Sequence, residues 1–248
     1  MAFPQDALRR DHFLDGRVSA WQPVRGYRSA TDAVFLAAAV PARPGAAVLE
    51  LGCGAGVAAL CVMARVPGVL VTGVEVQPAY ADLAERNGVR VIMADLADLP
   101  ADLRAQSFDH VMANPPYFDA AATGAEDAGR DVAQREATPL ALWIDCGLRR
   151  LRPGGRLTLI NRAQRLPEML AALSGRAGEI RVLPLIPRAG RAAGRVIVQA
   201  RKGARGPFCL LPGLVVHEGP AHDGDRDSFT QAASDILRGG KPLDLAAR

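Results

Sequence analysis

Short apolar runs alternate with amphipathic stretches through most of this 248-residue chain. From residue 46 onward this order predicts strands separated by helices, which is typical of a mostly parallel sheet with helices on both faces. The predicted strands span residues 46–51, 69–75, 89–93, 108–113, 155–160, 180–186 and 195–200. The predicted helices span residues 31–40, 57–65, 78–86, 138–151, 166–173 and 229–237. The pattern therefore indicates an α/β fold.

The last two predicted strands have no helix between them, so we expect an antiparallel hairpin near the C-terminus. Near the other end, Asp15-Gly16 lies between two short apolar runs, which indicates a second hairpin. A further apolar stretch, residues 210–216, follows the last predicted strand. We expect a single domain over 1–248, with an N-terminal extension (1–44), a core (45–205) and a C-terminal tail (206–248).

Composition narrows the class of protein. Hydrophobic residues make up 49% of the chain, enough for a sizeable core. The four cysteines are scattered without CxxC spacing, which favours neither a zinc site nor a disulfide framework and fits a reducing cytoplasm. Charges and glycines interrupt the apolar stretch 48–76, and the N-terminus lacks the pattern of a secretion signal. We expect a cytoplasmic protein that neither binds a metal nor spans a membrane.

Basic residues concentrate in one part of the chain. The net charge is +4, and residues 176–205 hold eight basic residues against the single acid Glu179. Such a bias, with Arg188, Arg191 and Arg195 at its centre, could form an electrostatic footprint for nucleic-acid phosphates. A solvated loop and strand edge explain the same residues about as well.

Four residues, Asn114-Pro115-Pro116-Tyr117, follow the predicted strand 108–113. Two prolines cannot continue a central strand, so the chain must leave the sheet in a stiff turn with free carbonyls. An amide oxygen and a prolyl carbonyl can accept hydrogen bonds from an NH2 group while the tyrosine ring stacks on its plane. The turn therefore suits a planar amino group, although the same residues are also common turn punctuation.

Three further polar features stand at the ends of neighbouring predicted strands. Gly52, Gly54 and Gly56 form a G-x-G-x-G turn between a strand and a helix, which lets a ligand approach the backbone. Glu75 ends the next strand, where a carboxylate can accept hydrogen bonds from ribose hydroxyls. Asp95 follows the third strand and could accept from an adenine amino group. Each acid alone could also be a surface charge that caps a neighbouring helix, but the ordered set favours a nucleotide-like cofactor.

This order resembles the class I methyltransferases that use S-adenosylmethionine (SAM), and the Asn-Pro-Pro-Tyr turn is similar to that of the branch that methylates amino groups. Most of the chain resembles the valine tRNA adenine-N6 methyltransferases, which modify the adenine just 3′ of the anticodon. The resemblance rests on segment 26–37 (GYRSATDAVFLA), on the stretch from 135–136 through Trp143 to 153–155, and on the arginine-rich hairpin ending at 201–203.

The resemblance implies a Rossmann-like fold with a mostly parallel seven-stranded sheet, SAM as the cofactor and tRNA as the partner. The sequence leaves open whether the protein is a monomer or a homodimer. It implies catalytic roles for Asn114, Pro115 and Tyr117. The implied cofactor-binding residues are Tyr27, Asp32, Glu50, Gly52, Gly54, Gly56, Glu75, Asp95 and Asn114. The implied substrate-binding residues are Pro116, Tyr117, Phe118, Arg188, Arg191 and Arg195.

The expected activity is therefore N6-methylation of a tRNA adenine, in which Asn114 Oδ1 and the Pro115 carbonyl accept from the amino group and Tyr117 stacks on the base. Three alternatives stay open. The same turn serves glutamine-N5 protein methyltransferases and other RNA or DNA amino-methyltransferases. A SAM- or RNA-binding module without turnover is the third, although an intact turn beside an intact cofactor set argues against it.

Overall fold

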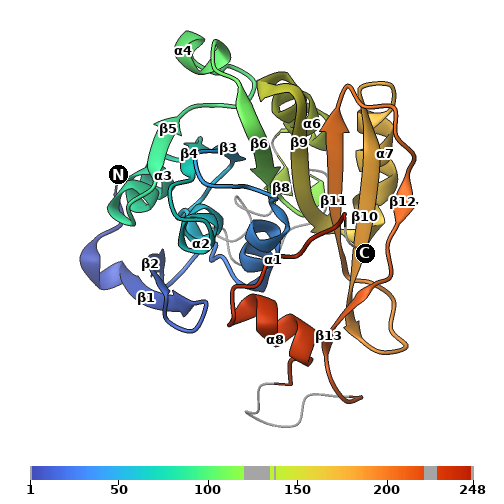
Figure 1. The fold of residues 1–248 in the computed structure, drawn as a ribbon. Helices are drawn as coiled ribbons and strands as arrows, with labels where there is room; N and C mark the ends of the chain where they lie inside the picture. The colour runs from blue at the N-terminus through green and yellow to red at the C-terminus, as the bar shows by residue number, and fades with distance from the viewer. Residues whose placement is uncertain (1, 120–134, 137, 221–227, 247–248) are drawn as a thin grey trace.

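The computed structural model describes residues 2–119, 135–136, 138–220 and 228–246. The central sheet runs in the order β12-β10-β11-β9-β6-β3-β4-β5, and β13 also pairs with β10 (Figure 1). The strands β3, β4, β5, β6 and β9 are parallel, and β10 and β11 add an antiparallel pair beside β9. The long strands are β3 (Ala47–Leu51), β4 (Leu70–Glu75), β5 (Arg90–Met93), β6 (Phe108–Ala113), β9 (Leu151–Arg162), β10 (Ala177–Arg188) and β11 (Arg195–Lys202).

Two clusters of buried side chains flank this sheet. One lies under α1 (Thr31–Ala39), α2 (Val57–Arg65) and α8 (Gln231–Leu237), with α3 (Pro78–Arg86) packed beside them. The other lies under α6 (Leu140–Arg150), α7 (Leu166–Leu173) and the short α4 (Ala101–Arg104). The buried face of α6 follows from its apolar spacing, since Leu140, Trp143 and Ile144 are buried on one side and Arg149 is exposed on the other.

An N-terminal hairpin of β1 (Leu8–Phe13) and β2 (Val18–Pro23) confirms the turn expected at Asp15-Gly16. Asn87, just after α3, fastens this hairpin to the core. Its Oδ1 accepts from the Trp21 backbone N–H at 2.8 Å, and its Nδ2 donates to the carbonyls of Trp21 and Ala55 at 2.9 Å. The hairpin therefore lies against the glycine turn rather than apart from it.

The class of fold is confirmed, and the sheet is larger than the seven strands expected. Two short strands of the tail, β12 (Cys209–Leu210) and β13 (Leu214–His217), run parallel to β10, so the β10–β11 hairpin does not form the edge. The tail also contributes α8 to the same buried cluster as α1. The division into extension, core and tail stays a prediction.

Several predicted boundaries were wrong by a few residues. The strand β9 begins at Leu151 rather than at residue 155, because Pro153 and Gly154 lie at its exposed start beside β6 instead of in a separate stop. The helix α6 ends at Arg150 accordingly. The turn of helix α4 and the two-stranded pairing of β7 (Phe118–Asp119) with β8 (Arg135–Glu136) were not expected. No helix within the described residues is long and apolar enough to cross a membrane.

Candidate active site

The carboxyl ends of the parallel strands meet at one edge of the sheet and enclose a cavity of about 250 Å³. Every polar feature that the sequence places at a strand end contributes to it. The lining includes Tyr27, Gly52, Gly54, Glu75, Asp95, Asn114, Pro115, Pro116 and Tyr117, together with Val74, Val76, Gln77, Tyr80, Ala94, Leu96, Thr138 and Trp143. Most of the remaining lining is apolar, so the cavity suits a ligand with a flat body and a few polar groups.

The glycine turn forms the floor of this cavity, and its backbone needs glycine. Gly52 and Gly54 have φ angles of 64° and 54°, which other residues rarely adopt. A Cβ on Gly52 would also lie 2.5 Å from Cη2 of Trp143, so that the indole packs directly on the backbone. The Trp143 Nε1 donates to the Thr138 carbonyl at 3.2 Å, which fixes the ring in that place.

Glu75 holds the turn and faces the ligand space. Its Oε2 accepts from the Gly54 N–H and its Oε1 from the Gln77 N–H, each at 2.9 Å. Burial raises the pKa of this carboxyl, and the backbone hydrogen bonds oppose that rise. A carboxylate oxygen can accept more than one hydrogen bond, so both oxygens can still receive ribose hydroxyls.

Asp95 stands at the mouth of the cavity. Its side chain is exposed, and its Oδ1 accepts from the Ala97 N–H at 2.9 Å. The hydrogen bond fixes one oxygen against the backbone of the turn that follows β5. The carboxylate is thus preorganised beside the apolar lining residues Ala94 and Leu96.

Asn114 carries a buried acceptor that is not used. Among the described residues no donor contacts its Oδ1, although the atom is shielded from solvent. Its Nδ2 donates to the Tyr27 hydroxyl at 3.5 Å, which orients the amide with that oxygen left over. Burial raises the pKa of the Tyr27 hydroxyl to about 12, so this group stays protonated. A buried acceptor without a partner is costly, which indicates that a ligand supplies the missing donor.

The two prolyl carbonyls beside Asn114 are held from behind. Asn161, fully buried at the end of β9, donates from Nδ2 to the Pro115 carbonyl at 3.3 Å. Arg165 donates to the Pro116 carbonyl at 3.4 Å. Sequence reasoning missed Asn161, although its position at the carboxyl end of the next parallel strand was a usable signal. The Pro115 carbonyl keeps a second lone pair for a ligand.

Tyr117 is held by two residues from distant parts of the chain. Its hydroxyl donates to Asp32 Oδ2, and Arg195 Nε donates to the same oxygen at 3.0 Å. The Arg195 guanidinium also lies over the tyrosine ring, 4.3 Å from the ring centroid. Burial and the neighbouring Asp32 carboxylate raise the pKa of the Tyr117 hydroxyl. Asp32 and Arg195 therefore belong to the surroundings of Tyr117, not to the cavity wall.

Comparisons with known proteins identify the family to which this arrangement of strand ends belongs. The family model for the methyltransferase small domain matches residues 30–182. The chain belongs to this family.

Two curated relatives of this methyltransferase are named tRNA1(Val) (adenine(37)-N6)-methyltransferase. The one from Porphyromonas gingivalis is 32% identical over 178 residues, which cover 63% of this chain and 69% of the relative. The one from Dickeya chrysanthemi is 32% identical over 186 residues, covering 70% and 72%. A crystal structure of a predicted O-methyltransferase from Agrobacterium tumefaciens superimposes with a TM-score of 0.70 at 28% identity, covering 86% of this chain and 98% of that one.

SAM is the cofactor of this methyltransferase, and the residues of the cavity fit it. Gly52 and Gly54 line the cavity, Glu75 and Asp95 face the ligand space, and most of the remaining lining is apolar. Besides Asp32, two residues implied as cofactor ligands lie outside the lining. Gly56 starts α2 with its Cα against Val89, where a Cβ would come within 2.7 Å of Cγ2.

The other is Glu50, whose buried Oε2 accepts from the Ala59 N–H at 3.0 Å, in the first turn of α2. Burial raises the pKa of Glu50 to about 8. The Glu50 carboxyl therefore supports the helix behind the glycine turn in this structure. A direct contact of Glu50 with SAM stays a prediction.

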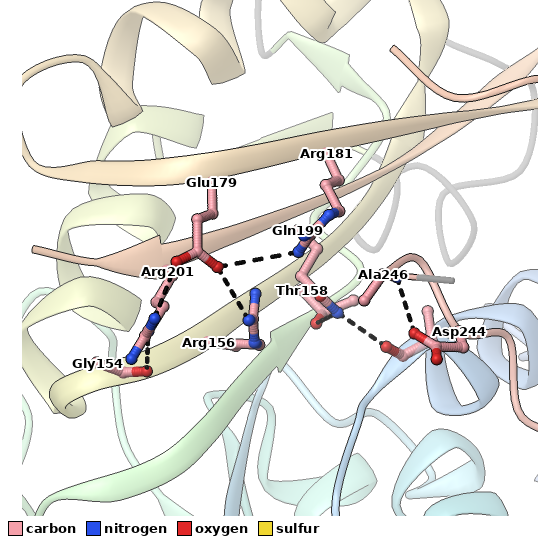
Figure 2. A network of polar contacts seen from close by, with 10 residues as sticks. Gly154, Arg156, Thr158, Glu179, Arg181, Gln199, Arg201, Asp244 and Ala246 are labelled. Carbon is pink, nitrogen blue, oxygen red and sulfur yellow. Dashed lines mark hydrogen bonds and ion pairs between the residues drawn. The ribbon is translucent and has the colours of Figure 1, made fainter. Parts of the chain in front are cut away.

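The arginine-rich stretch does not form one surface, because its two strands run the length of the sheet. Arg195 pairs in register with Arg162 at the active-site end, whereas Arg201 pairs with Arg156 at the opposite end. At that far end Glu179 binds Arg156 and Arg201, at 3.1 and 2.8 Å, with Arg181 beside them (Figure 2).

At the active-site end, the predicted substrate residues differ in their surroundings. Arg188 donates to the backbone carbonyls of Glu218 and Gly219, and the Arg191 side chain is exposed. Arg195 contacts Tyr117 and Asp32, as described above. The side chain of Phe118 lies outside the described residues. A contact of these arginines with RNA phosphates stays a prediction.

Proposed function

We propose that this methyltransferase transfers a methyl group from SAM to N6 of an adenine in tRNA, at adenine 37 of valine tRNA. The Oδ1 of Asn114 carries the proposal, because it has no donor among the described residues and Asn114 lines the same cavity as Tyr117. The names of the curated relatives support the substrate. The cytoplasmic location and the absence of a metal expected from the sequence stay predictions.

The chemistry asked of the protein is mainly orientation. SAM supplies a methyl group on a positively charged sulfur, which makes that carbon electrophilic. The adenine N6 lone pair is delocalised into the ring and is a weak nucleophile. If the two N6 hydrogens donate to Asn114 Oδ1 and to the free lone pair of the Pro115 carbonyl, the nitrogen turns toward tetrahedral geometry and its lone pair becomes available.

The surrounding residues keep these two acceptors in place. Tyr27 holds the amide of Asn114, and Asn161 holds the Pro115 carbonyl. Because both acceptors are fixed before the substrate arrives, little reorganisation is needed during the reaction. A base must leave its stack to reach them, which costs less in a loop such as the anticodon loop than in a duplex.

The test is methyl transfer from labelled SAM to unmodified valine tRNA, followed by mass analysis of the nucleosides. We expect N6-methyladenosine at adenine 37, and none in a transcript with guanine at that position. Release factor protein and duplex DNA are tested beside it. Label in either of these, with no N6-methyladenosine in tRNA, would reject the proposal.

A further inference from the structure

Tyr117 stands in a polar cluster whose members come from three separate elements. Asp32 lies in the first turn of α1, Tyr117 follows β6, and Arg195 begins β11. The three are joined by two hydrogen bonds to Asp32 Oδ2 and by the guanidinium over the ring. An acid in the first turn of a helix is also stabilised in its charged form by the helix dipole. The cluster is thus electrostatically matched at each contact.

These contacts fix both rotations of the tyrosine side chain. The hydroxyl bond to Asp32 sets where the far end of the ring points, and the guanidinium sets which way its faces turn. The backbone on the N-terminal side is already stiff, because two prolines precede Tyr117. We call residues 114–117 the acceptor turn. Without Asp32 and Arg195, the Tyr117 ring would be the part of this turn that rotates freely.

The two faces of the ring are not equivalent. Arg195 covers one face, and Arg195 does not line the cavity, whereas Tyr117 does. A planar base that enters from the cavity can therefore stack only on the face opposite Arg195. A cation over the covered face draws ring electron density away from the open face, which favours stacking with an electron-rich purine.

We propose that Asp32 and Arg195 are positioning residues that lock the Tyr117 ring, so that the base stacks in the order Arg195–Tyr117–base. This deepens the proposed function and rests on it for the identity of the base. It replaces two sequence-based expectations, since Asp32 was implied as a cofactor residue and Arg195 as a phosphate contact.

A double-mutant cycle separates action through Tyr117 from direct contact with a ligand. The variants Asp32→Ala, Tyr117→Phe and the pair of them are compared in kcat and KM for tRNA and in Kd for SAM. We expect Asp32→Ala and Tyr117→Phe each to lower kcat/KM for tRNA roughly tenfold, as expected for a lost hydrogen bond to a charged group. In Tyr117→Phe the change at Asp32 should add little, and SAM affinity should stay unchanged in every variant. Additive effects, or weaker SAM binding in Asp32→Ala, would overturn the proposal.

Substitutions of Arg195 by lysine and by alanine test whether its charge or its planar shape is needed. Lysine keeps the charge but lacks the planar group that covers the ring. We expect Arg195→Lys to lose nearly as much kcat/KM as Arg195→Ala, with an unchanged salt dependence of tRNA binding. Full rescue by lysine, or a smaller salt slope in Arg195→Ala, would assign Arg195 to a phosphate instead. Asp102→Ala, an exposed acid in the first turn of α4, is the matched control and should behave as the wild type.

A spectroscopic test needs no substrate. The chain has three tyrosines, so ring-labelled tyrosine gives few NMR signals, and Tyr117→Phe assigns the one of interest. We expect a slowly flipping Tyr117 ring in the wild type and a fast one in Asp32→Ala and Arg195→Ala, with unchanged SAM affinity as the control for folding. A ring that flips equally fast in all three would reject the lock even if tRNA is methylated. A locked ring in a protein that methylates no RNA would reject only the proposed function.

Discussion

Replacing Asn114 by alanine should separate catalysis from stability. The substitution removes Oδ1, the buried acceptor that has no donor among the described residues. A hydrogen bond to a group that gains positive charge is worth about 1.5–3 kcal/mol. Since 1.36 kcal/mol is about tenfold in rate, kcat should fall roughly 10- to 150-fold. The Kd for SAM should stay nearly unchanged, because the amide oxygen is proposed to bind the amino group of the base and not the cofactor.

The stability of Asn114→Ala should stay within about 1 kcal/mol of the wild type. Among the described residues, the free protein loses one long hydrogen bond, from Nδ2 to the Tyr27 hydroxyl at 3.5 Å. It is also relieved of the cost of an unsatisfied buried oxygen. Asn161→Ala is the matched control. Its amide is fully buried and makes two hydrogen bonds, to the Pro115 carbonyl and from the Arg162 N–H, so it should lose about 2 kcal/mol or more.

The assay is single-turnover methylation of tRNA with SAM in excess, read beside SAM titration by calorimetry and denaturant unfolding of both variants. The reasoning fails if Asn114→Ala loses SAM affinity while its turnover per bound cofactor is unchanged. It also fails if Asn114→Ala is as unstable as Asn161→Ala, since the Asn114 amide would then support the fold.

Three further predictions concern Gly52, Glu50 and Arg65. Gly52→Ala should weaken SAM binding at least tenfold and lower the unfolding free energy by about 1–3 kcal/mol, measured by calorimetry and urea unfolding, because a Cβ there meets Trp143 at a positive φ. Burial raises the pKa of Glu50 from 4.5 to about 8. The protonated carboxyl therefore stabilises the folded state fully below pH 4.5, and this stabilisation is lost as the pH rises to about 8. The unfolding free energy of Glu50→Gln should therefore rise relative to that of the wild type across this pH interval. Arg65 donates to the Ala37 and Val40 carbonyls at the end of α1, at 2.8 and 2.6 Å, so Arg65→Met should lose about 1–3 kcal/mol in the same unfolding assay.

The parts of the site that follow strand order could be predicted from the sequence. The glycine turn, Glu75, Asp95 and Asn114 each end a strand, and parallel strands bring their carboxyl ends to one edge. Five of the nine residues implied as cofactor ligands are among these strand-end residues and line the cavity, as does Tyr27. The residue types and their positions in the order of strands were enough for this prediction, which did not depend on side-chain packing.

The parts that depend on register and packing could not be predicted. The basic stretch is continuous in sequence, but Arg195 and Arg201 lie near opposite ends of β11, and therefore near opposite edges of the sheet along the strand direction. The contact of Asp32 with Arg195 joins residues 163 positions apart. No local pattern reports such a distance. Asn161 had a local signal, its place at the end of β9, but a buried side chain behind the turn leaves no mark in composition.

The N-terminal segment 27–32 belongs to the site because it contacts both Asn114, which ends a strand, and Tyr117, which is held by packing. Tyr27 contacts Asn114 at the start of the acceptor turn, and Asp32 contacts Tyr117 at its end. The segment is tied to the hairpin by Gln22, whose Nε2 and Oε1 bond the backbone of Ser29 at 3.1 and 2.7 Å. The N-terminal residues thus hold both the acceptor amide and the stacking ring at a fixed spacing. Since a methyl transfer that relies on orientation depends on that spacing, we infer that the hairpin contributes to catalysis through the turn rather than through any contact with SAM.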